Sequence, residues 1–340
     1  GGPPPAVAVA PAVAVPTTAL GSLQVSRTIQ GYWQLAGGHG AYTEQEAVRN
    51  MAAHLAAGMT TLDTADIYGP SESIVGKFVA EEARAVPCTK FCCFRNLQGI
   101  DKTEVRARVL KQIARLQVDS LPLVAFFWAD YGVKRYADVA LMLTELREEG
   151  LIKEIGVTNF DTKRLRELKD AGVPVVSNQV EFSLLDQRPE RSGMREYCVD
   201  NGVKLIAFGT VGAGLLSEAY LGKPPPTREQ LEAGGFSLKK YIGTASRAGT
   251  WDYTQSLLVL LDSIAKKHSV SIANVAQRYL LDLQGVASVL IGVRNQKHIK
   301  DNVRTHSFSL DEDDRAAIRD LIRTAKGPVG DVWDIERGYV

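Results

Sequence analysis

Three side chains that could take part in proton transfer interrupt or follow apolar stretches of the chain. Asp63 lies in TLDTA, Lys90 lies in CTKF, and Tyr68 follows Asp63 by five residues. An acid and a base in apolar strands should form an ion pair, because an unpaired charge there would cost several kcal/mol. The ammonium of Lys90 would also favour the ionised phenol and lower the pKa of Tyr68 from about 10, which suits a general acid. The pattern fits a purely structural ion pair with a capping tyrosine equally well.

The order of apolar and amphipathic segments indicates how these side chains are positioned. Eight runs after residue 26 have the length and composition of strands, and amphipathic stretches separate them: RTIQGYW, TTLDTA, PCTKFCCF, LPLVAFFW, IKEIGVT, VPVVSNQVEF, VKLIAFG and VASVLIG. Several of the helical stretches end at a glycine, a common C-cap, namely Gly58, Gly150, Gly172 and Gly202. The pattern predicts an α/β protein, a single-domain (β/α)8 TIM barrel over residues 21–340, whose functional groups gather at the carboxyl ends of the strands.

Three alternatives to this fold and class are disfavoured by the sequence. A doubly wound sheet should carry a phosphate-binding turn after its first strand, but GYWQLAGGHG lacks the G-x-G-x-x-G spacing. The chain has 40 basic and 39 acidic residues, so no charge excess indicates nucleic-acid binding. No apolar run of 18 residues occurs, so no transmembrane segment is predicted.

Residues 1–20 differ in composition from the rest, being rich in Ala, Val and Pro and free of charge. We interpret them as an extension that is either flexible or docked on a partner protein. Such leaders are typical of what remains after removal of an organelle-targeting peptide, so the plastid and the cytoplasm are the two locations considered. The four cysteines have neither metal-ligand spacing nor the density of a disulfide scaffold, which favours a reducing intracellular compartment and no metal site.

Six segments in a fixed order resemble the successive signatures of the aldo-keto reductase superfamily. They are LDTADIYG, TKF, GVTNF, SNQVEFSLLDQRP, LIAFGTVGAGLL and GVRNQKHIKDN. The resemblance implies a nicotinamide cofactor, usually NADPH, at the carboxyl-terminal mouth of the barrel, and a catalytic tetrad of Asp, Tyr, Lys and His. Asp63, Tyr68 and Lys90 match the first three members, whereas Phe127 stands in the position of the His.

The exchange of His for Phe127 bears on the expected rate. A phenyl ring cannot donate a hydrogen bond to a substrate carbonyl. Losing one such donor typically costs about 2.7–4 kcal/mol, a factor on the order of 10²–10³ in rate. His39, in GGHGAY, is the histidine that the predicted topology would place on the same face of the barrel.

The resemblance also assigns the residues that bind the cofactor. Ser177, Asn178 and Gln179 would hold the carboxamide, and Phe208 would stack on the nicotinamide. The pyrophosphate and adenosine contacts would come from two later segments, which contribute Gly209, Thr210, Val211, Gly212, Gly214 and Leu216, then Gly292, Arg294, His298, Asp301 and Asn302. Arg294 favours NADPH over NADH, because a guanidinium suits a 2′-phosphate. Trp33 is expected beside the cofactor and, with Tyr68 and Trp128, in the substrate pocket.

Two functions remain open from the sequence. The first is an NADPH-dependent oxidoreductase that reduces an aldehyde or ketone with Tyr68 as the proton donor. The second is an NADP-binding pseudoenzyme, an assembly or regulatory subunit whose reductase activity is weak or lost because Phe127 replaces His. Residues 217–253 form an insertion that could act as a lid, and no motif names the substrate.

Overall fold

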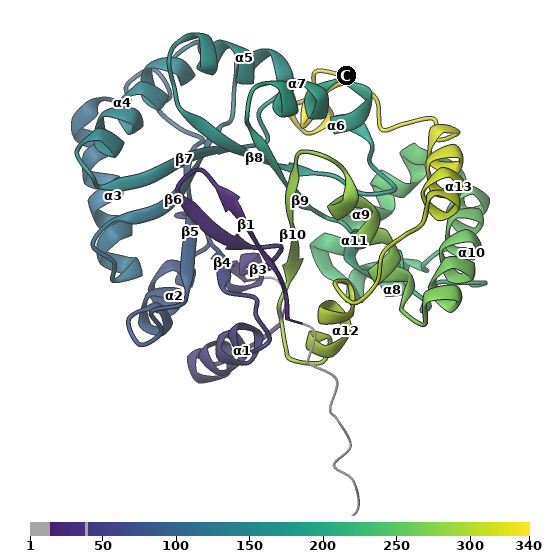
Figure 1. Cartoon of the computed structure of the whole chain (residues 1–340). Coiled ribbons are helices and arrows are strands. Elements are labelled where there is room, and N and C mark those ends of the chain that lie inside the picture. Colours follow the sequence, from purple (N-terminus) through teal and green to yellow (C-terminus); the bar gives the residue numbers. More distant parts are fainter. Residues whose placement is uncertain (1–13, 38–39) are drawn as a thin grey trace, which may run out of the picture.

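A closed barrel of eight parallel strands forms the centre of the computed structural model, which describes residues 14–37 and 40–340 (Figure 1). The strands follow one another around the barrel from β3 to β10, and β10 pairs with β3 to close it. They are β3 Thr28–Gly31, β4 Thr61–Asp63, β5 Val86–Cys93, β6 Leu121–Trp128, β7 Ile152–Thr158, β8 Val175–Glu181, β9 Lys204–Phe208 and β10 Val286–Gly292. The predicted (β/α)8 barrel is therefore confirmed.

Helices surround the barrel (Figure 1). They are α1 Glu44–Ala56, α2 Ser71–Val79, α3 Lys102–Leu116, α4 Tyr136–Glu148, α5 Thr162–Asp170, α6 Arg188–Arg191, α7 Met194–Asp200, α10 Trp251–His268, α11 Ile272–Asp282, α12 Ile299–Arg304 and α13 Glu312–Arg323. In α3 the buried residues recur every three or four positions, which is the spacing of one helix face. No helix in the described part of the chain is long and apolar enough to cross a membrane.

A hairpin closes the amino-terminal end of the barrel. Strands β1 (Thr17–Leu20) and β2 (Leu23–Ser26) pair in antiparallel fashion, and Leu20 and Val25 are fully buried against the interior of the barrel. The boundary that the sequence analysis set after residue 20 therefore cuts through a folded element. Residues 1–13, on which the predictions of flexibility and partner docking mainly fall, lie outside the described residues.

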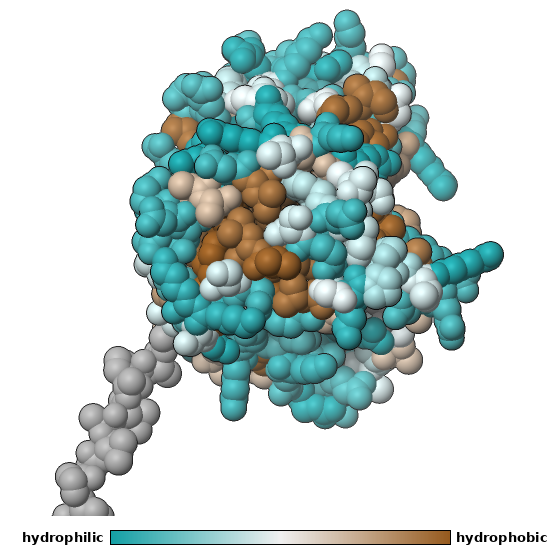
Figure 2. Space-filling model, turned by 90° about the vertical axis from the view of Figure 1, so that its right-hand side faces the viewer, coloured by the Kyte–Doolittle hydropathy of each residue, from teal (hydrophilic) through white to brown (hydrophobic). Residues whose placement is uncertain are grey.

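The insertion and the carboxyl-terminal segment add the remaining helices. Between β9 and α10 lie η2 (Gly212–Gly214), α8 (Arg228–Ala233) and α9 (Gly235–Ala248), and α14 (Asp334–Arg337) lies near the end of the chain. Figure 2 shows the side of the molecule that carries α10 and α13, where groups of apolar side chains interrupt a mainly hydrophilic surface. Exposed apolar residues of this insertion and the helix after it include Phe236 and Val259.

His306 links the region after α12 to the first strand of the barrel. Its Nε2 lies 2.8 Å from the hydroxyl of Thr28 in β3. Burial, together with the nearby Arg278 and Arg27, lowers the pKa of His306 to about 4. An unfolded chain would protonate the same imidazole near pH 6.5. Between these two values the unfolded state therefore binds one proton that the folded state does not.

We expect the substitution H306Q to flatten the acid limb of the stability profile. As the pH falls from about 6.5 to about 4, protonation of His306 in the unfolded state lowers the free energy of unfolding of the wild type. Glutamine keeps a group that can bond to Thr28 but cannot titrate. Urea unfolding at several pH values checks this, and parallel profiles for the two proteins would contradict it.

Candidate active site

A buried ion pair joins Asp63 and Lys90. Asp63 ends β4 and Lys90 lies in the middle of β5, and the Lys90 Nζ is 2.5 Å from the Asp63 Oδ2. Lys90 also donates to the carbonyl oxygen of Thr64 at 2.9 Å. Burial alone would lower the pKa of Lys90, but the Asp63 carboxylate, with smaller contributions from Tyr68 and Cys92, raises it overall, so the amine stays charged. The ion pair predicted from the sequence is present.

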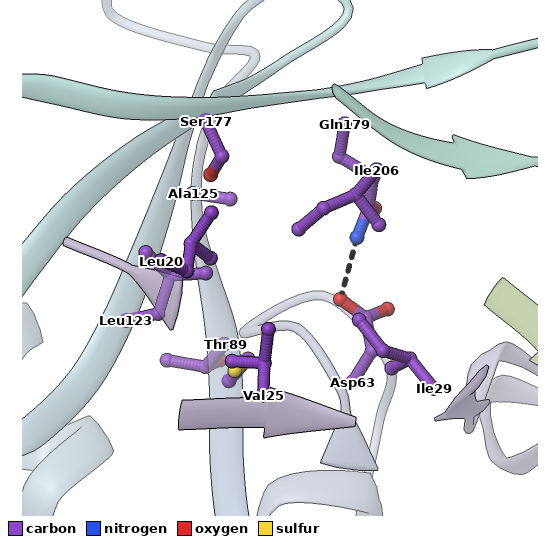
Figure 3. A pocket seen from close by; sticks show the side chains of 11 residues that line it. Leu20, Val25, Ile29, Asp63, Thr89, Leu123, Ala125, Ser177, Gln179 and Ile206 are labelled. Carbon is purple, nitrogen blue, oxygen red and sulfur yellow. Dashed lines mark hydrogen bonds between the residues drawn. The ribbon is translucent and has the colours of Figure 1, made fainter. Parts of the chain in front are cut away.

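Gln179 completes the environment of Asp63 from the far side of the barrel. Its Nε2 donates to the Asp63 Oδ1 at 2.8 Å, and Figure 3 shows this bond crossing the interior from β8. Below it lies a cavity of about 10 Å³, lined by the hairpin residues Leu20 and Val25 and by Ser177. The carboxylate therefore faces an almost filled, mostly apolar interior, and solvent reaches this group of residues from the other end.

Tyr68 lies in the turn after β4, with its ring beside the ammonium of Lys90. The Nζ of Lys90 is 4.9 Å from the centroid of the ring. Burial of the phenol raises the pKa of Tyr68 above its ordinary value, and Lys90 opposes this only in part, because Asp63 and Cys92 add to the rise. The predicted lowering of this pKa is therefore wrong. The phenol keeps its proton at neutral pH, which is the form that a proton donor needs.

Phe127 faces the interior beside this group, one layer nearer the mouth than Lys90. In the register of β5 and β6, Phe127 lies opposite Cys92 and Ala125 lies opposite Lys90. The ring of Phe127 packs 5.0 Å from the ring of Phe94, centroid to centroid. The position therefore supplies an apolar wall and no hydrogen-bond donor. His39, the histidine considered as a substitute, lies outside the described residues.

Strand alternation separates the three residues that were assigned to the carboxamide. Gln179 and Ser177 face the interior, but Ser177 lies a layer deeper, where it lines the cavity under Gln179. Asn178 points outward, and its Nδ2 donates to the carbonyl oxygen of Phe160 and contacts the sulfur of Met194 in α7. The assignment of Asn178 to the cofactor is therefore wrong, and Ser177 lies below the layer that a cofactor at the mouth would reach.

Asn159 lies at a strand end, but the sequence analysis gave it no role in the site. It follows β7 with a φ of 55°, and its backbone N–H donates to the carbonyl oxygen of Gln179 at 2.9 Å. The Oδ1 of Asn159 is buried and has no hydrogen-bond partner. An unpaired buried acceptor at a barrel mouth points to a ligand that donates to it. The segment GVTNF carried this signal, since it places an amide directly after a strand.

The predicted substrate-pocket tryptophans have different surroundings. Trp128 is fully buried in the helix layer, where its Nε1 donates to the carbonyl oxygens of Asp130 and Val133. It cannot line a pocket at the mouth, so this prediction is wrong, because neighbours on a strand point to opposite faces. Trp33 remains at the mouth, and its ring meets the ring of Phe236 in α9 edge to face at 5.6 Å.

The loop after β9 has the backbone expected of a phosphate-binding segment. Gly209, Gly212 and Gly214 all have positive φ, and the ring of Tyr241 in α9 covers Gly209 so closely that a Cβ there would lie 2.6 Å from it. Thr210 is buried in this loop and Val211 is half-buried. Leu216 is fully buried in the core and cannot contact a cofactor.

Phe208 precedes this loop and lies at the mouth. Its ring is half-buried and lies 6.3 Å from the ring of Trp333, centroid to centroid, and 5.0 Å from the Nζ of Lys240 in α9. The insertion and the carboxyl-terminal segment therefore both reach the residue predicted to stack on the nicotinamide.

The adenosine-binding residues fall into two groups in the structure. Gly292 and Arg294 lie against the loop after β3, and Arg294 lines a cavity of about 460 Å³ together with Arg49 of α1. The other three lie at or in α12, where His298 is exposed, Asn302 is half-buried and Asp301 accepts a hydrogen bond from the hydroxyl of Ser271, the N-cap of α11.

Known proteins resemble this chain in sequence and in fold. A sequence model described as the Aldo/keto reductase family matches residues 28–323. Pyridoxal reductase, chloroplastic, of Arabidopsis thaliana is 28% identical over 321 residues, which cover 87% of this chain and 83% of that protein. Glyoxal reductase of Bacillus subtilis is 26% identical over 303 residues, covering 88% and 92%.

Two solved structures share the fold. The glycerol dehydrogenase AKR11B4 from Gluconobacter oxydans superimposes with a TM-score of 0.78 at 22% identity, covering 93% of this chain and 98% of that one. A mutant of Gox0644 in complex with NADPH superimposes with a TM-score of 0.68 at 22% identity, covering 91% and 94%.

We expect D63N to destabilise the fold more than loss of the whole ion pair does. The asparagine leaves the Lys90 ammonium buried without its counter-charge, which costs about 3–5 kcal/mol in the free energy of unfolding. The double variant D63N/K90M removes both charges and should recover part of this loss. Denaturant unfolding at pH 7 checks both variants, and equal stability of D63N and wild type would contradict a buried pair.

Proposed function

Because this chain belongs to the aldo/keto reductase family and is an oxidoreductase, we propose that it reduces an aldehyde or ketone with NADPH and uses Tyr68 as the proton donor. The observation that carries the proposal is the buried Asp63–Lys90 pair with the ring of Tyr68 beside it. A barrel can fold without a carboxylate, an ammonium and a phenol gathered at one mouth, whereas delivery of a proton to a carbonyl oxygen requires an acidic group of controlled pKa there.

The residues at the mouth fit a nicotinamide cofactor. The unpaired Oδ1 of Asn159 can accept from the carboxamide N–H, and Gln179 is adjacent, since its carbonyl oxygen accepts from the backbone N–H of Asn159. The glycine-rich loop after β9 can turn backbone N–H groups to the pyrophosphate. When bound, NADPH supplies the hydride to the carbonyl carbon. NADPH is favoured over NADH because Arg294 and Arg49 line one cavity, where guanidinium groups suit a 2′-phosphate.

The protein's own part in the reaction is to deliver a proton and to stabilise the charge left behind. Tyr68 gives its phenolic proton to the carbonyl oxygen and becomes a phenolate. The Lys90 ammonium beside the ring stabilises that phenolate, because opposite charges attract strongly where water is excluded. Asp63 keeps Lys90 charged, and Gln179 holds Asp63 in place.

Phe127 leaves the carbonyl oxygen with one donor fewer than the tetrad of the family provides. The proposed enzyme therefore relies on Tyr68 alone for polarisation from the protein side, and its rate should be lower than a histidine would allow. The second interpretation, a cofactor-binding subunit without activity, gains no support, since the relatives found in the comparisons include named reductases.

We further propose a plastid location, supported by the composition of residues 1–20 and by the plastid relative. Microscopy of the full-length protein fused to a fluorescent protein tests it.

We expect Y68F to lose at least about a hundredfold in kcat/KM for aldehydes, since general acid catalysis typically contributes 10²–10⁴-fold. NADPH binding, followed by fluorescence titration, should be unchanged. The control Y197F removes the hydroxyl of a tyrosine whose ring stacks on Arg166 in the outer helix layer, and it should keep full activity. F127H should raise the rate. Equal background rates in wild type, Y68F and F127H would instead identify a protein without reductase chemistry.

The cofactor contacts can be separated by a pair of asparagine variants. N159G keeps the positive φ without strain but removes the amide, and it should raise the Kd for NADPH on the order of tenfold, the worth of about one hydrogen bond. N178A removes a buried amide that points away from the mouth, so it should lower stability and leave the Kd unchanged. A higher Kd for NADPH in N178A than in N159G would show that Asn178, and not Asn159, contacts the cofactor.

A further inference from the structure

We propose that the guanidinium of Arg337 binds an anionic group of the substrate, so that the preferred substrates are aromatic aldehydes or ketones that carry a carboxylate or similar anion. The inference rests on the proposed function, because it names the substrate class of the same site. Arg337 lies in α14, outside every motif singled out in the sequence.

The position of Arg337 is fixed at the rim of the barrel between β6 and β7. Its Nη2 donates to the carbonyl oxygen of Trp128, the last residue of β6, and its Nη1 donates to that of Asn159, just after β7, both at 2.9 Å. Its Cζ lies 5.5 Å from the centroid of the Phe127 ring. The positive charge therefore lies beside the side chain that replaces the family's histidine, on the outer side of the carbonyl-binding position.

Arg337 has no acidic partner. Among the described residues, no carboxylate oxygen lies within 4 Å of its guanidinium, whereas Arg108, Arg164 and Arg188 each form such a pair. Its Nε is buried without a hydrogen-bond partner. A half-buried cation that meets only carbonyl oxygens keeps a positive field, and the low-dielectric walls of a mouth concentrate that field. Arg27 also bonds only to carbonyl oxygens, but these lie at the closed end of the barrel, near the start of β10.

The carboxyl-terminal segment holds Arg337 rigidly and keeps its neighbouring acid occupied. Glu336 binds the buried Arg188 through both carboxylate oxygens, at 2.7 and 2.9 Å. Tyr339 accepts a hydrogen bond from the backbone of Tyr131, and the Cζ of Arg337 lies 4.2 Å from the centroid of the Tyr131 ring. A cation held in place in advance loses little entropy when it binds an anion.

The apolar wall beside this charge indicates which chemical group of the substrate connects its carbonyl to its anionic group. Phe94 is 52% exposed although it packs on Phe127, so an apolar ring faces the open mouth. A flat aromatic compound can stack along these rings, with its carbonyl towards Tyr68 and its anionic substituent towards Arg337. A structural arginine would account for the two carbonyl contacts but not for an uncompensated charge next to an exposed aromatic surface.

The test compares a charged aldehyde with its neutral analogue. We expect wild type to favour para-formylbenzoate over methyl para-formylbenzoate on the order of tenfold or more in kcat/KM, because a charge-assisted contact is worth that much. R337M should bring the ratio close to one, mainly through KM for the acid, and R337K should give an intermediate ratio. The wild-type preference should shrink at high salt.

The control R164M removes a guanidinium that lies 4.8 Å from the same Tyr131 ring but is neutralised by Asp161, and it should keep the wild-type ratio. Melting temperatures and NADPH titration show whether each variant is folded; if R337M does not fold, R337K and the salt dependence decide. A wild-type ratio near one, or an unchanged ratio in the Arg337 variants, would overturn the inference alone. Failure of every aldehyde to oxidise NADPH would overturn the proposed function with it.

Discussion

The ion pair between Asp63 and Lys90 is the contact on which the rest of the site depends. Two buried charges are tolerable only when each finds its partner and further hydrogen bonds, and here Thr64 and Gln179 supply those bonds. Lys90 reaches Asp63 from the next strand, but Gln179 reaches it from β8, which is not a neighbour of β4. In an open sheet three strands would separate them. Closure of the barrel thus brings Gln179 to Asp63 and helps to stabilise the buried pair. The pair in turn fixes how these strands face one another.

The two ends of the barrel are unequal, and this sets the electrostatics of the site. The hairpin fills the amino-terminal end with Leu20 and Val25, so the ion pair has an apolar floor. Such a floor strengthens every charge interaction above it and also penalises ionisation of Tyr68. The second effect exceeds the attraction of Lys90 in the protein alone, which is why the phenol keeps its proton. In the proposed reaction, the phenol therefore gives up its proton only when charge develops on the carbonyl oxygen.

The sequence predicts the barrel and the ion pair well, because both follow from local patterns. The strand runs and helix caps can be recognised in order along the sequence. An acid and a base in apolar strands are expected to pair, because either charge would be costly to bury alone. The errors at Asn178 and Trp128 came from treating consecutive residues as one site, although the pleat turns neighbours to opposite faces. The rise in the pKa of Tyr68 depends on how deeply a loop phenol is buried, and the position of Arg337 depends on contacts with residues far away in sequence. Neither feature can be recognised from a short stretch of sequence.

Charges at the mouth link the two segments that cover it. Glu181, at the end of β8, binds Lys240 of α9 at 2.8 Å and lies 3.9 Å from Arg188, which also binds Asp186 and Glu336. Burial, with a smaller contribution from Glu181, raises the pKa of Asp186 to about 6, although Arg188 opposes the rise. The insertion and the carboxyl-terminal segment are therefore linked through one buried pair, since Lys240 binds Glu181 and Glu336 binds Arg188, and displacing either segment would leave a buried charge with fewer partners. Because Arg188 takes up Glu336, the guanidinium of Arg337 is left with backbone carbonyls only, so the same network that anchors the segment also leaves a positive charge at the rim.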